Sequence, residues 1–362
     1  MKVLHIETGR HLYGGALQVC YLMEGLANRG IENLLVCSIN SKISKTSAAY
    51  ATVLQVPMLG DLDFIFPFRL GRIIRKERPD IVHVHSRRGA DTWSGICASF
   101  YRTPSVLTRR VDNREWSPFA RLKYKSYDKI ITISEGIRQV LLSEGLDDKQ
   151  VQCIHSVVNT EDYQLKADKE WFAKEFDIQS DAQVIGVIAQ LITRKGHRFL
   201  LEIIPRLLEL FPKLKIVFCG QGPLEAELKA RVASLGLDKT VIFAGFRNDM
   251  PQILPCLDLV VHPALMEGLG VSLLQAAAAG IPIVGANAGG IPEIVHNRKN
   301  GLLVEPGNTE QMFEAIKILL EDKALTRQYG NAGKELVRQL FSVDKMVDSY
   351  IRLYSQILED KG

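Results

Sequence analysis

The chain has 362 residues, of which 46% are hydrophobic and 24% charged, so it is long enough for two domains with complete cores. No apolar run approaches the roughly 20 residues of a membrane-spanning helix. Met1-Lys2 leads directly into a strand-like run, so we also expect no signal peptide. The six cysteines are scattered without a CxxC pair, which is typical of free thiols in a reducing cytoplasm.

Positive charge is concentrated in the first half of the chain. Residues 1–160 contain 22 Lys and Arg against 15 Asp and Glu, whereas the remaining residues contain 23 against 26, which gives the net charge of +4. This balance favours an acidic partner for the first half, such as a phosphorylated substrate, anionic lipid headgroups or nucleic acid. A mild excess of positive charge is also found on ordinary solvated surfaces, so a surface without an acidic partner is the alternative interpretation.

Strand-like and helix-like runs alternate through the first half. The expected strands are Val3–Thr8, Asn33–Ser38, Asp80–His85, Ser105–Arg109 and Lys129–Ser134. Helical spacing occurs in Ala16–Arg29 and in the Arg-rich run Phe68–Glu77. This alternation predicts a parallel, doubly wound sheet, whose ligands bind outside the carboxyl ends of the strands.

A second alternation begins after Val151–Asp168, the best candidate for an interdomain connection. Its expected strands are Gln183–Ala189, Leu214–Gly220, Thr240–Ala244, Leu257–Val261, Pro282–Gly285 and Leu302–Val304. The chain ends in helices, the last of them the amphipathic Val343–Leu358. We therefore expect a Rossmann-like N-terminal domain over 1–160, a second over 161–340, and a terminal helix over 341–362.

The stretch His262–Val295 is the most informative part of the sequence. A polar loop with Glu267, Gly268 and Gly270 leads into the helix-forming run Val271–Ala279. The free N–H groups and the dipole of a helix N-terminus favour an anion, and the glycines let a ligand approach the main chain. An ordinary strand–helix crossover with one satisfied polar side chain, Gln275, is the alternative interpretation.

Other polar groups follow predicted strands. Arg194-Lys195 would suit a diphosphate, because arginine offers a planar fork and lysine a mobile point charge; a solvated turn is the alternative. Gly14-Gly15 precedes a helix and permits contact between phosphate or sugar and backbone N–H groups. The turns at Gly220–Pro223 and Gly245–Arg247 line a nucleotide pocket or simply reverse the chain.

His85 ends an apolar strand, and His83 lies two residues earlier on the same face. A strand-end histidine can hydrogen bond a substrate hydroxyl, and the alternative is a satisfied core residue. We reject a metal site at this pair, because no third ligand of matching spacing is evident in the sequence.

The order of these motifs resembles that of the retaining nucleotide-sugar glycosyltransferases of family 4. The resemblance covers nearly the whole chain and is most specific over Pro263–Glu293, with Arg194-Lys195-Gly196 as support. It implies the GT-B fold, in which two doubly wound Rossmann-like domains face each other across a cleft and the C-terminal helix crosses back to the first domain.

The resemblance also implies the roles of individual residues. The N-terminal domain would hold the acceptor, and the C-terminal domain the nucleotide-sugar. Arg194 and Lys195 would neutralise the diphosphate, Glu267 would contact hydroxyls of the transferred sugar, and His85 would hydrogen bond the donor sugar. These four residues are the expected catalytic set. The expected donor-binding set is Gly14, Gly15, Arg194, Lys195, Gly222, Phe246, Glu267, Gly268, Leu269, Gly270, Val271 and Gln275, with no metal and no cofactor.

Two positions depart from the family pattern. Gln275 stands where a second glutamate usually grips the ribose hydroxyls, and an amide accepts such a hydrogen bond without charge assistance. The segment Ile154–Asn159 stands where Pro-Asn-Gly-Val-Asp is common. A scaffold protein with impaired donor binding is therefore the alternative to an active enzyme.

The leading interpretation is a cytoplasmic transferase acting on a cell-envelope glycan, such as lipopolysaccharide core or a lipid-linked saccharide, and not on nucleic acid. Attachment to the inner face of the membrane would follow from the basic residues of the first half. These are Arg69, Arg72, Arg75, Lys76, Arg109, Arg110, Arg121, Lys123 and Lys125.

Overall fold

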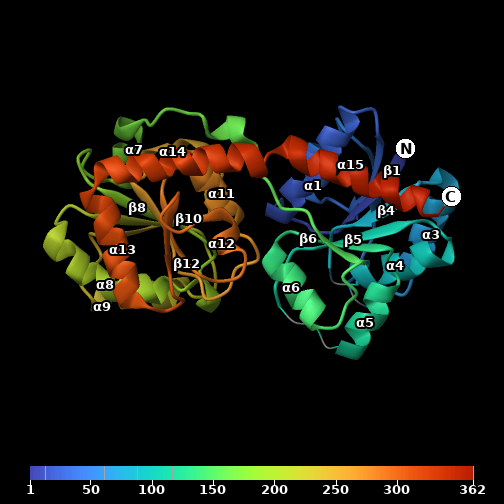
Figure 1. Cartoon of the computed structure of the whole chain (residues 1–362), viewed down its shortest axis with the longest axis horizontal. Coiled ribbons are helices and arrows are strands. Elements are labelled where there is room, and N and C mark those ends of the chain that lie inside the picture. The colour runs from blue at the N-terminus through green and yellow to red at the C-terminus, as the bar shows by residue number, and fades with distance from the viewer. Residues whose placement is uncertain (13, 61, 88, 114, 116, 362) are drawn as a thin grey trace. The chain divides into compact units, whose positions relative to one another are not determined.

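The computed structural model describes residues 1–12, 14–60, 62–87, 89–113, 115 and 117–361, and they form two compact units. Unit 1 comprises Met1–Val157 and Val343–Gly362, and unit 2 comprises Val158–Ser342. The chain passes from one unit to the other after residues 157 and 342, where the sequence indicated 160 and 340. Each unit contains one parallel sheet with helices on its faces (Figure 1), which confirms the expected pair of doubly wound α/β units.

The sheet of unit 1 has the strand order β3-β2-β1-β4-β5-β6-β7. Its strands are β1 (Lys2–Glu7), β2 (Glu32–Ser38), β3 (Thr52–Val56), β4 (Ile81–Val84), β5 (Ser105–Arg109), β6 (Lys129–Thr132) and β7 (Val151–Cys153). Its helices are α1 (Gly14–Ala27), α2 (Lys42–Thr46), α3 (Phe66–Glu77), α4 (Ala90–Phe100), α5 (Ser117–Lys125), α6 (Glu135–Ser143) and α15 (Val343–Glu359). Two edge strands were not among those expected from the sequence: β3, whose side chains are mostly exposed or half-buried, and β7, which lies in the stretch expected to be the interdomain connection.

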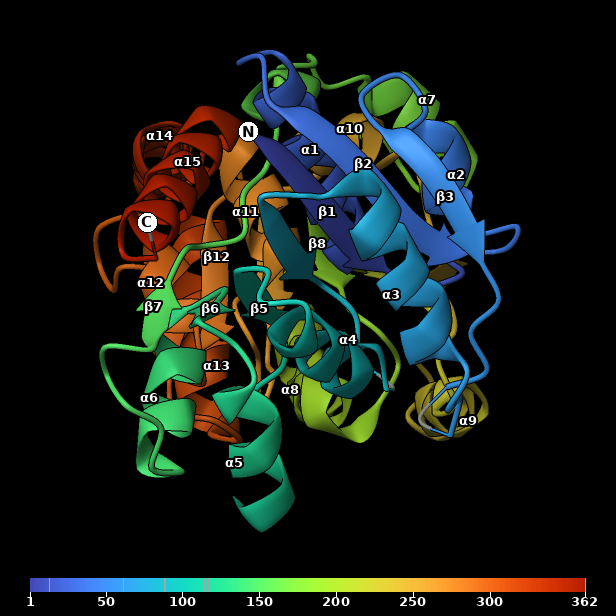
Figure 2. The same ribbon diagram turned by 90° about the vertical axis from the view of Figure 1, so that its right-hand side faces the viewer.

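Successive side chains along the strands of unit 1 point to opposite faces of the sheet, and each face has its own apolar core. Leu4 and Ile6 of β1 point to the face covered by α3, α4 and α5, whereas Val3 points to the face covered by α1 and α15. Gly25 of α1 lets α15 pack closely, since a Cβ atom at Gly25 would lie 2.3 Å from Cγ2 of Val347. The expected return of the last helix to the first domain is thereby confirmed (Figure 2).

The sheet of unit 2 has the strand order β10-β9-β8-β11-β12-β13. Its strands are β8 (Val184–Ile188), β9 (Lys215–Cys219), β10 (Val241–Gly245), β11 (Leu259–His262), β12 (Ile283–Ala286) and β13 (Gly301–Val304). Its α-helices are α7 (Lys169–Phe176), α8 (His197–Leu210), α9 (Glu225–Ser234), α10 (Met250–Ile253), α11 (Val271–Ala278), α12 (Ile291–Ile294), α13 (Thr309–Glu321) and α14 (Lys323–Leu340). Short 3-10 turns are η1 (Thr160–Tyr163), η2 (Thr193–Lys195) and η3 (Leu254–Cys256).

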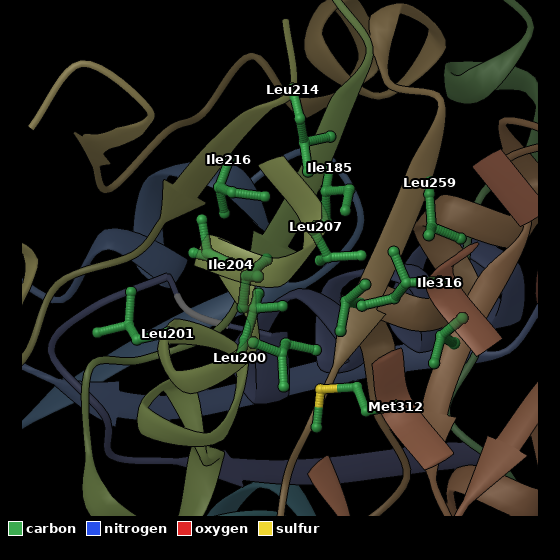
Figure 3. Close-up of a cluster of buried hydrophobic side chains, with 14 of the residues drawn as sticks. Ile185, Leu200, Leu201, Ile204, Leu207, Leu214, Ile216, Leu259, Met312 and Ile316 are labelled. Atoms are coloured by element: carbon green, nitrogen blue, oxygen red, sulfur yellow. The ribbon is translucent and has the colours of Figure 1, made fainter. Parts of the chain in front are cut away.

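The core of unit 2 lies between its sheet and helices α8 and α13. Figure 3 shows part of this buried cluster, in which Ile185 of β8 is joined by Ile204 of α8 and Ile316 of α13. Gly280 follows α11 with a φ of +77°, a left-handed conformation that glycine adopts without strain just past a helix end. The alternation of strands and helices thus places the polar loops at the carboxyl edge of each sheet.

Candidate functional site

Glu267 lies in the loop between β11 and α11, and its carboxylate is held from two sides. Lys195 forms an ion pair with Oε2 through its Nζ atom, and Nε2 of His262 donates a hydrogen bond to the same oxygen at 2.7 Å. The other oxygen, Oε1, accepts from the backbone N–H of Gly268 at 3.1 Å. Three groups from β11, its following loop and the turn after β8 therefore meet at one carboxylate.

The electrostatics of this cluster keep Glu267 ionised. Burial alone would raise the pKa of its carboxyl group, but the hydrogen bond from His262 and the charges of His262 and Lys195 outweigh burial and hold the pKa well below its usual range. Lys195 itself is buried. Lys195 and Glu267 were expected from the sequence, whereas His262 was not, because its place at the last residue of an apolar strand was its only signal.

Close packing of glycines sets the position of this cluster. Gly289 has a φ of +54°, and a Cβ atom there would lie 1.9 Å from the carbonyl oxygen of Glu267. Gly196 has a φ of +71°, and its Cβ atom would lie 1.9 Å from the carbonyl oxygen of Pro263. Neither contact permits a side chain, so both glycines hold the loop against neighbouring turns.

Helix α11 begins directly after the loop. Its N-cap residue, Gly270, has a φ of +95° and no side chain caps the first turn. Gln275 lies one turn further along the helix and is partly exposed. An uncapped helix start beside a lysine and a carboxylate presents N–H donors, a cation and an acceptor at one sheet edge.

The remaining expected residues of unit 2 lie along the same edge. Arg194 is partly exposed, and its carbonyl accepts from the N–H of Leu265 at 2.8 Å, which joins the η2 turn to the loop of Glu267. Gly222 follows β9, packed on the carbonyl of Leu191. Phe246 follows β10 and is 49% exposed. The structure thus brings Lys195 and Glu267 into direct contact, with Arg194 beside them on the same turn.

Gly14, Gly15 and His85 belong to unit 1. Gly14 and Gly15 open α1, and a Cβ atom at Gly15 would lie 3.3 Å from Cδ of Arg110. His85 follows β4 and is 4% exposed. Tyr13, next to the glycines, lies outside the described residues. Gly14 and Gly15 thus come after β1 and His85 comes after the neighbouring strand β4, which agrees with the positions expected from the sequence.

The reason for rejecting a histidine cluster was wrong. His5 of β1 lies beside His83 and His85, with one ring nitrogen of each within 4.8 Å of the others. Parallel pairing aligns His5 with His83 although they are far apart in the chain. Both nitrogens of His83 contact hydroxyl groups, Tyr354 at 2.6 Å and Thr108 at 2.7 Å. The structure therefore shows a hydrogen-bonded cluster that the sequence did not reveal.

Two cations assigned to the basic surface are buried instead. Arg109 is 3% exposed and pairs with Glu115, and Lys123 pairs with Asp91 and Glu115. Burial would raise the pKa of the Glu115 carboxyl group, but Lys123 and Arg109 lower it to about 2. These residues form an internal ion-pair network, so they do not face a partner.

Arg110 behaves differently from its neighbour Arg109. Its Nε atom is buried without a hydrogen-bond partner among the described residues, and its aliphatic part passes over Gly15. Burial lowers the pKa of its guanidinium, and Tyr350 and Glu7 oppose that shift. A guanidinium with this buried N–H beside a helix start is a further candidate for contact with an anionic or hydroxylated ligand.

The fold and the polar groups at the carboxyl edge of each sheet indicate the class of protein. Paired doubly wound units with polar groups at the carboxyl edges of their sheets are the architecture that the sequence resemblance implied, that of the GT-B fold. Two family models together span nearly the whole chain, Glycosyltransferase Family 4 over residues 13–162 and Glycosyl transferases group 1 over residues 168–336.

Individual relatives agree with this class. Glycosyltransferase MJ1607 of Methanocaldococcus jannaschii is 26% identical over 65% of this chain, an alignment that covers 61% of the relative. The lipopolysaccharide core biosynthesis glycosyltransferase LpsE of Rhizobium meliloti is 25% identical over 98% of both chains. The structure of Anabaena Alr3699/HepE in complex with UDP and glucose superposes with a TM-score of 0.85 at 20% identity, over 98% of this chain and 99% of that one.

The chain belongs to glycosyltransferase family 4, a retaining family of GT-B enzymes that use nucleotide-sugars. The family resemblance noted in the sequence is thereby confirmed.

Proposed function

We propose that this glycosyltransferase moves a sugar, without a metal ion, from a nucleotide-diphosphate-sugar to a saccharide or lipid-linked saccharide of the cell envelope. The observation that carries the proposal is the contact between Lys195, His262 and Glu267 in front of α11. The leaving group is a nucleoside diphosphate, so stabilising its developing charge is the main catalytic task.

Each group of this cluster has a distinct role in the proposal. Lys195 and Arg194 neutralise the diphosphate, and the N-terminus of α11 adds N–H donors. Glu267 is ionised and accepts hydrogen bonds from hydroxyls of the transferred sugar. The departing phosphate takes the proton of the attacking hydroxyl on the same face of the sugar, which retains the configuration and requires no separate general base.

The donor is identified by screening purified protein against a panel of nucleotide-sugars by thermal shift and by diphosphate release, with and without chelator. One donor is expected to raise the Tm and to be hydrolysed slowly at an unchanged rate in chelator. Gln275→Glu is expected to lower the Kd of that donor about tenfold, since a charged acceptor strengthens one hydrogen bond by roughly 1–1.5 kcal/mol.

The alternative, a scaffold with impaired donor binding, makes the opposite prediction. No donor would then stabilise the natural protein, while Gln275→Glu would restore binding. Loss of diphosphate release in chelator, with recovery on adding Mg²⁺, would instead contradict metal independence.

The envelope acceptor is supported by a surface of unit 1. Large apolar side chains stand exposed around α3, α4 and α5, and helices α3 and α4 lie side by side (Figure 2). These side chains, called here the apolar rim, are Leu59, Leu62, Phe64, Ile65, Phe68, Ile96, Phe100 and Leu122. Exposed cations flank them at Arg72, Arg75, Lys76, Arg121 and Lys125.

The apolar rim and its cations match the chemistry of an anionic membrane surface. Apolar side chains enter the headgroup region, and each nearby cation adds about 1 kcal/mol of attraction. No described helix is both long and apolar enough to cross a membrane. We propose that unit 1 binds the membrane surface through this rim, where a lipid-linked acceptor is held, as the similarity to the LpsE relative also suggests.

Replacing Phe64, Phe68 and Phe100 by serine is expected to lower binding to vesicles containing anionic lipid by at least about tenfold, because each exposed ring loses its contact with lipid. Sedimentation with vesicles of mixed anionic and zwitterionic lipid measures this. The matched control is Ile318→Ser on α13, an exposed apolar residue of unit 2, which should leave binding unchanged. Equal binding of the triple variant and the natural protein would contradict the membrane proposal.

A further inference from the structure

A row of buried polar side chains crosses one face of the sheet in unit 1. It runs from Asn33 of β2 through His5 of β1 to His85 after β4. His5 and His85 are fully enclosed, with exposures of 0% and 4%. A buried polar row is costly unless its hydrogen bonds are made, so the direction of each bond carries information.

Asn33 determines which atom donates in the hydrogen bond at its end of the row. Its Nδ2 donates to the carbonyls of Met23 at 2.9 Å and Tyr50 at 3.1 Å, which leaves Oδ1 facing Nε2 of His5 at 3.1 Å. The reversed amide would place its oxygen against two carbonyl oxygens. Because Oδ1 only accepts, Nε2 of His5 carries a hydrogen.

That hydrogen determines the rest of the row. Burial lowers the pKa of His5 to about 4, against the hydrogen bond to Asn33 that raises it, so the ring is neutral at pH 7. A neutral ring with hydrogen on Nε2 has a bare Nδ1, which lies 3.1 Å from Nε2 of His85. Nε2 of His85 must therefore donate, and burial among His83, His5 and Arg110 keeps His85 neutral as well by lowering its pKa.

The row ends at Nδ1 of His85. This nitrogen is a lone-pair acceptor, and it is buried with no partner among the described residues. Arg110 follows the neighbouring strand β5, and its Nε–H is a buried donor that also has no partner there. A hydroxyl can donate to the lone pair of His85 Nδ1 and can accept from the N–H of Arg110, so it is a kind of group that suits either atom.

We propose that Asn33 and His5 are positioning residues that hold His85 as the tautomer with hydrogen on Nε2, so that Nδ1 accepts a hydrogen bond from a sugar hydroxyl of the substrate. The inference rests on the proposed function for the identity of the ligand, whereas the tautomer itself does not depend on it. The hydroxyl belongs either to the donor sugar or to the acceptor.

The tautomer is measured directly by long-range ¹H–¹⁵N correlation spectra of the ¹⁵N-labelled full chain at pH 7, without substrate. His85, assigned by loss of its signals in His85→Gln, is expected to show a protonated Nε2 and a bare Nδ1. Hydrogen on Nδ1 of His85 would overturn the proposal whatever the activity. Binding of Zn²⁺ by the three histidines would also overturn it, because a metal ion takes the lone pairs that the row uses.

Asn33→Asp reverses the row in a defined way. The aspartate loses the two hydrogen bonds that Nδ2 donates to Met23 and Tyr50 and places an oxygen against their carbonyls, so the variant should be less stable than the natural protein. In this setting the carboxylate stays ionised only with a cation beside it. His5, whose Nε2 faces it, supplies that cation by taking up a second proton, and it then donates from Nδ1. Nε2 of His85 must then accept, and its hydrogen moves to Nδ1. We expect kcat/KM to fall about 10- to 100-fold at neutral pH, which is the cost of one misdirected buried hydrogen bond.

The activity of Asn33→Asp should recover as the pH rises through the raised pKa of His5, a recovery that the natural protein does not show. His83, Arg110 and Glu7, with Tyr350 and Tyr354 of α15, are the other titratable groups around the row. They are identical in both proteins, so a difference between the pH profiles reports His5.

Two comparisons complete the experiment. Tyr354→Phe removes a buried hydroxyl from His83 without touching the row, and it should leave both the tautomer of His85 and kcat/KM unchanged. Donor hydrolysis without acceptor separates the two sources of the hydroxyl, since Asn33→Asp slows hydrolysis only if the hydroxyl is on the donor. Unchanged transfer and hydrolysis in a variant with reversed tautomers would overturn the link to the substrate. If the variant does not fold, the spectra of the natural protein still decide the tautomer.

Discussion

Replacing Glu267 by glutamine is expected to lower kcat/KM by about 10²- to 10³-fold while the chain remains folded. Glutamine still accepts hydrogen bonds from His262 and Lys195 but leaves the lysine cation buried without its counter-charge. It also weakens the hydrogen bonds proposed to hold the sugar hydroxyls. Initial rates over a range of donor concentrations give kcat/KM, and urea unfolding of the same protein separates loss of catalysis from loss of stability.

The pH dependence of stability gives this prediction a second readout. The pKa of Glu267 is lower in the folded chain than its ordinary value of 4.5, so its ionised form stabilises the fold above that pH. The free-energy difference between the natural protein and Glu267→Gln should be full at pH 7 and should shrink as the pH falls below 4.5. Glu310→Gln, which breaks an exposed ion pair with Arg206, serves as the control and should change neither activity nor stability measurably. A fully active Glu267→Gln enzyme would remove Glu267 from the proposed site.

Replacing Gly289 by alanine is expected to destabilise unit 2 by about 3–5 kcal/mol, among the largest effects of a single methyl group. The added Cβ atom would lie 1.9 Å from the carbonyl oxygen of Glu267, so the loop must move. A displacement of about 1 Å is enough to lower the rate roughly 10²-fold. Thermal unfolding and kcat/KM of the same preparation test both consequences.

Gly236→Ala is the matched control for this substitution. Gly236 has a φ of +66°, close to that of Gly289, but nothing lies within 4 Å of its added Cβ atom. It should therefore cost only the backbone strain of about 1–2 kcal/mol and leave kcat/KM unchanged. Equal effects of the two substitutions would mean that the contact with Glu267 is unimportant.

Local patterns in the sequence were sufficient for the architecture. Short apolar runs bounded by glycine and proline marked all six strands of unit 2, because strands buried on both faces of a parallel sheet read as continuous apolar runs. The same reasoning missed the two edge strands of unit 1, β3 and β7. β7 has only three residues, and the side chains of β3 are mostly exposed or half-buried although Val53, Leu54 and Val56 are apolar. The loop before α11 was also visible, because the positive φ angle of Gly270 favours glycine at this position of the sequence.

Contacts between distant segments could not be read in this way. The basic surface expected from the sequence included Arg109 and Lys123, yet both are buried, because Glu115 and Asp91 supply their counter-charges inside unit 1. Composition counts charges but does not show which of them are paired.

By itself, the sequence determined the two doubly wound units, the family, and the polar loops at the carboxyl ends of the strands, because these follow from patterns a few residues long. Only the tertiary structure brought Lys195 to Glu267, and Asn33 and His5 to His85. Parallel strands are paired through long crossovers, so strand register decides which side chains meet, and register depends on the packing of the whole sheet.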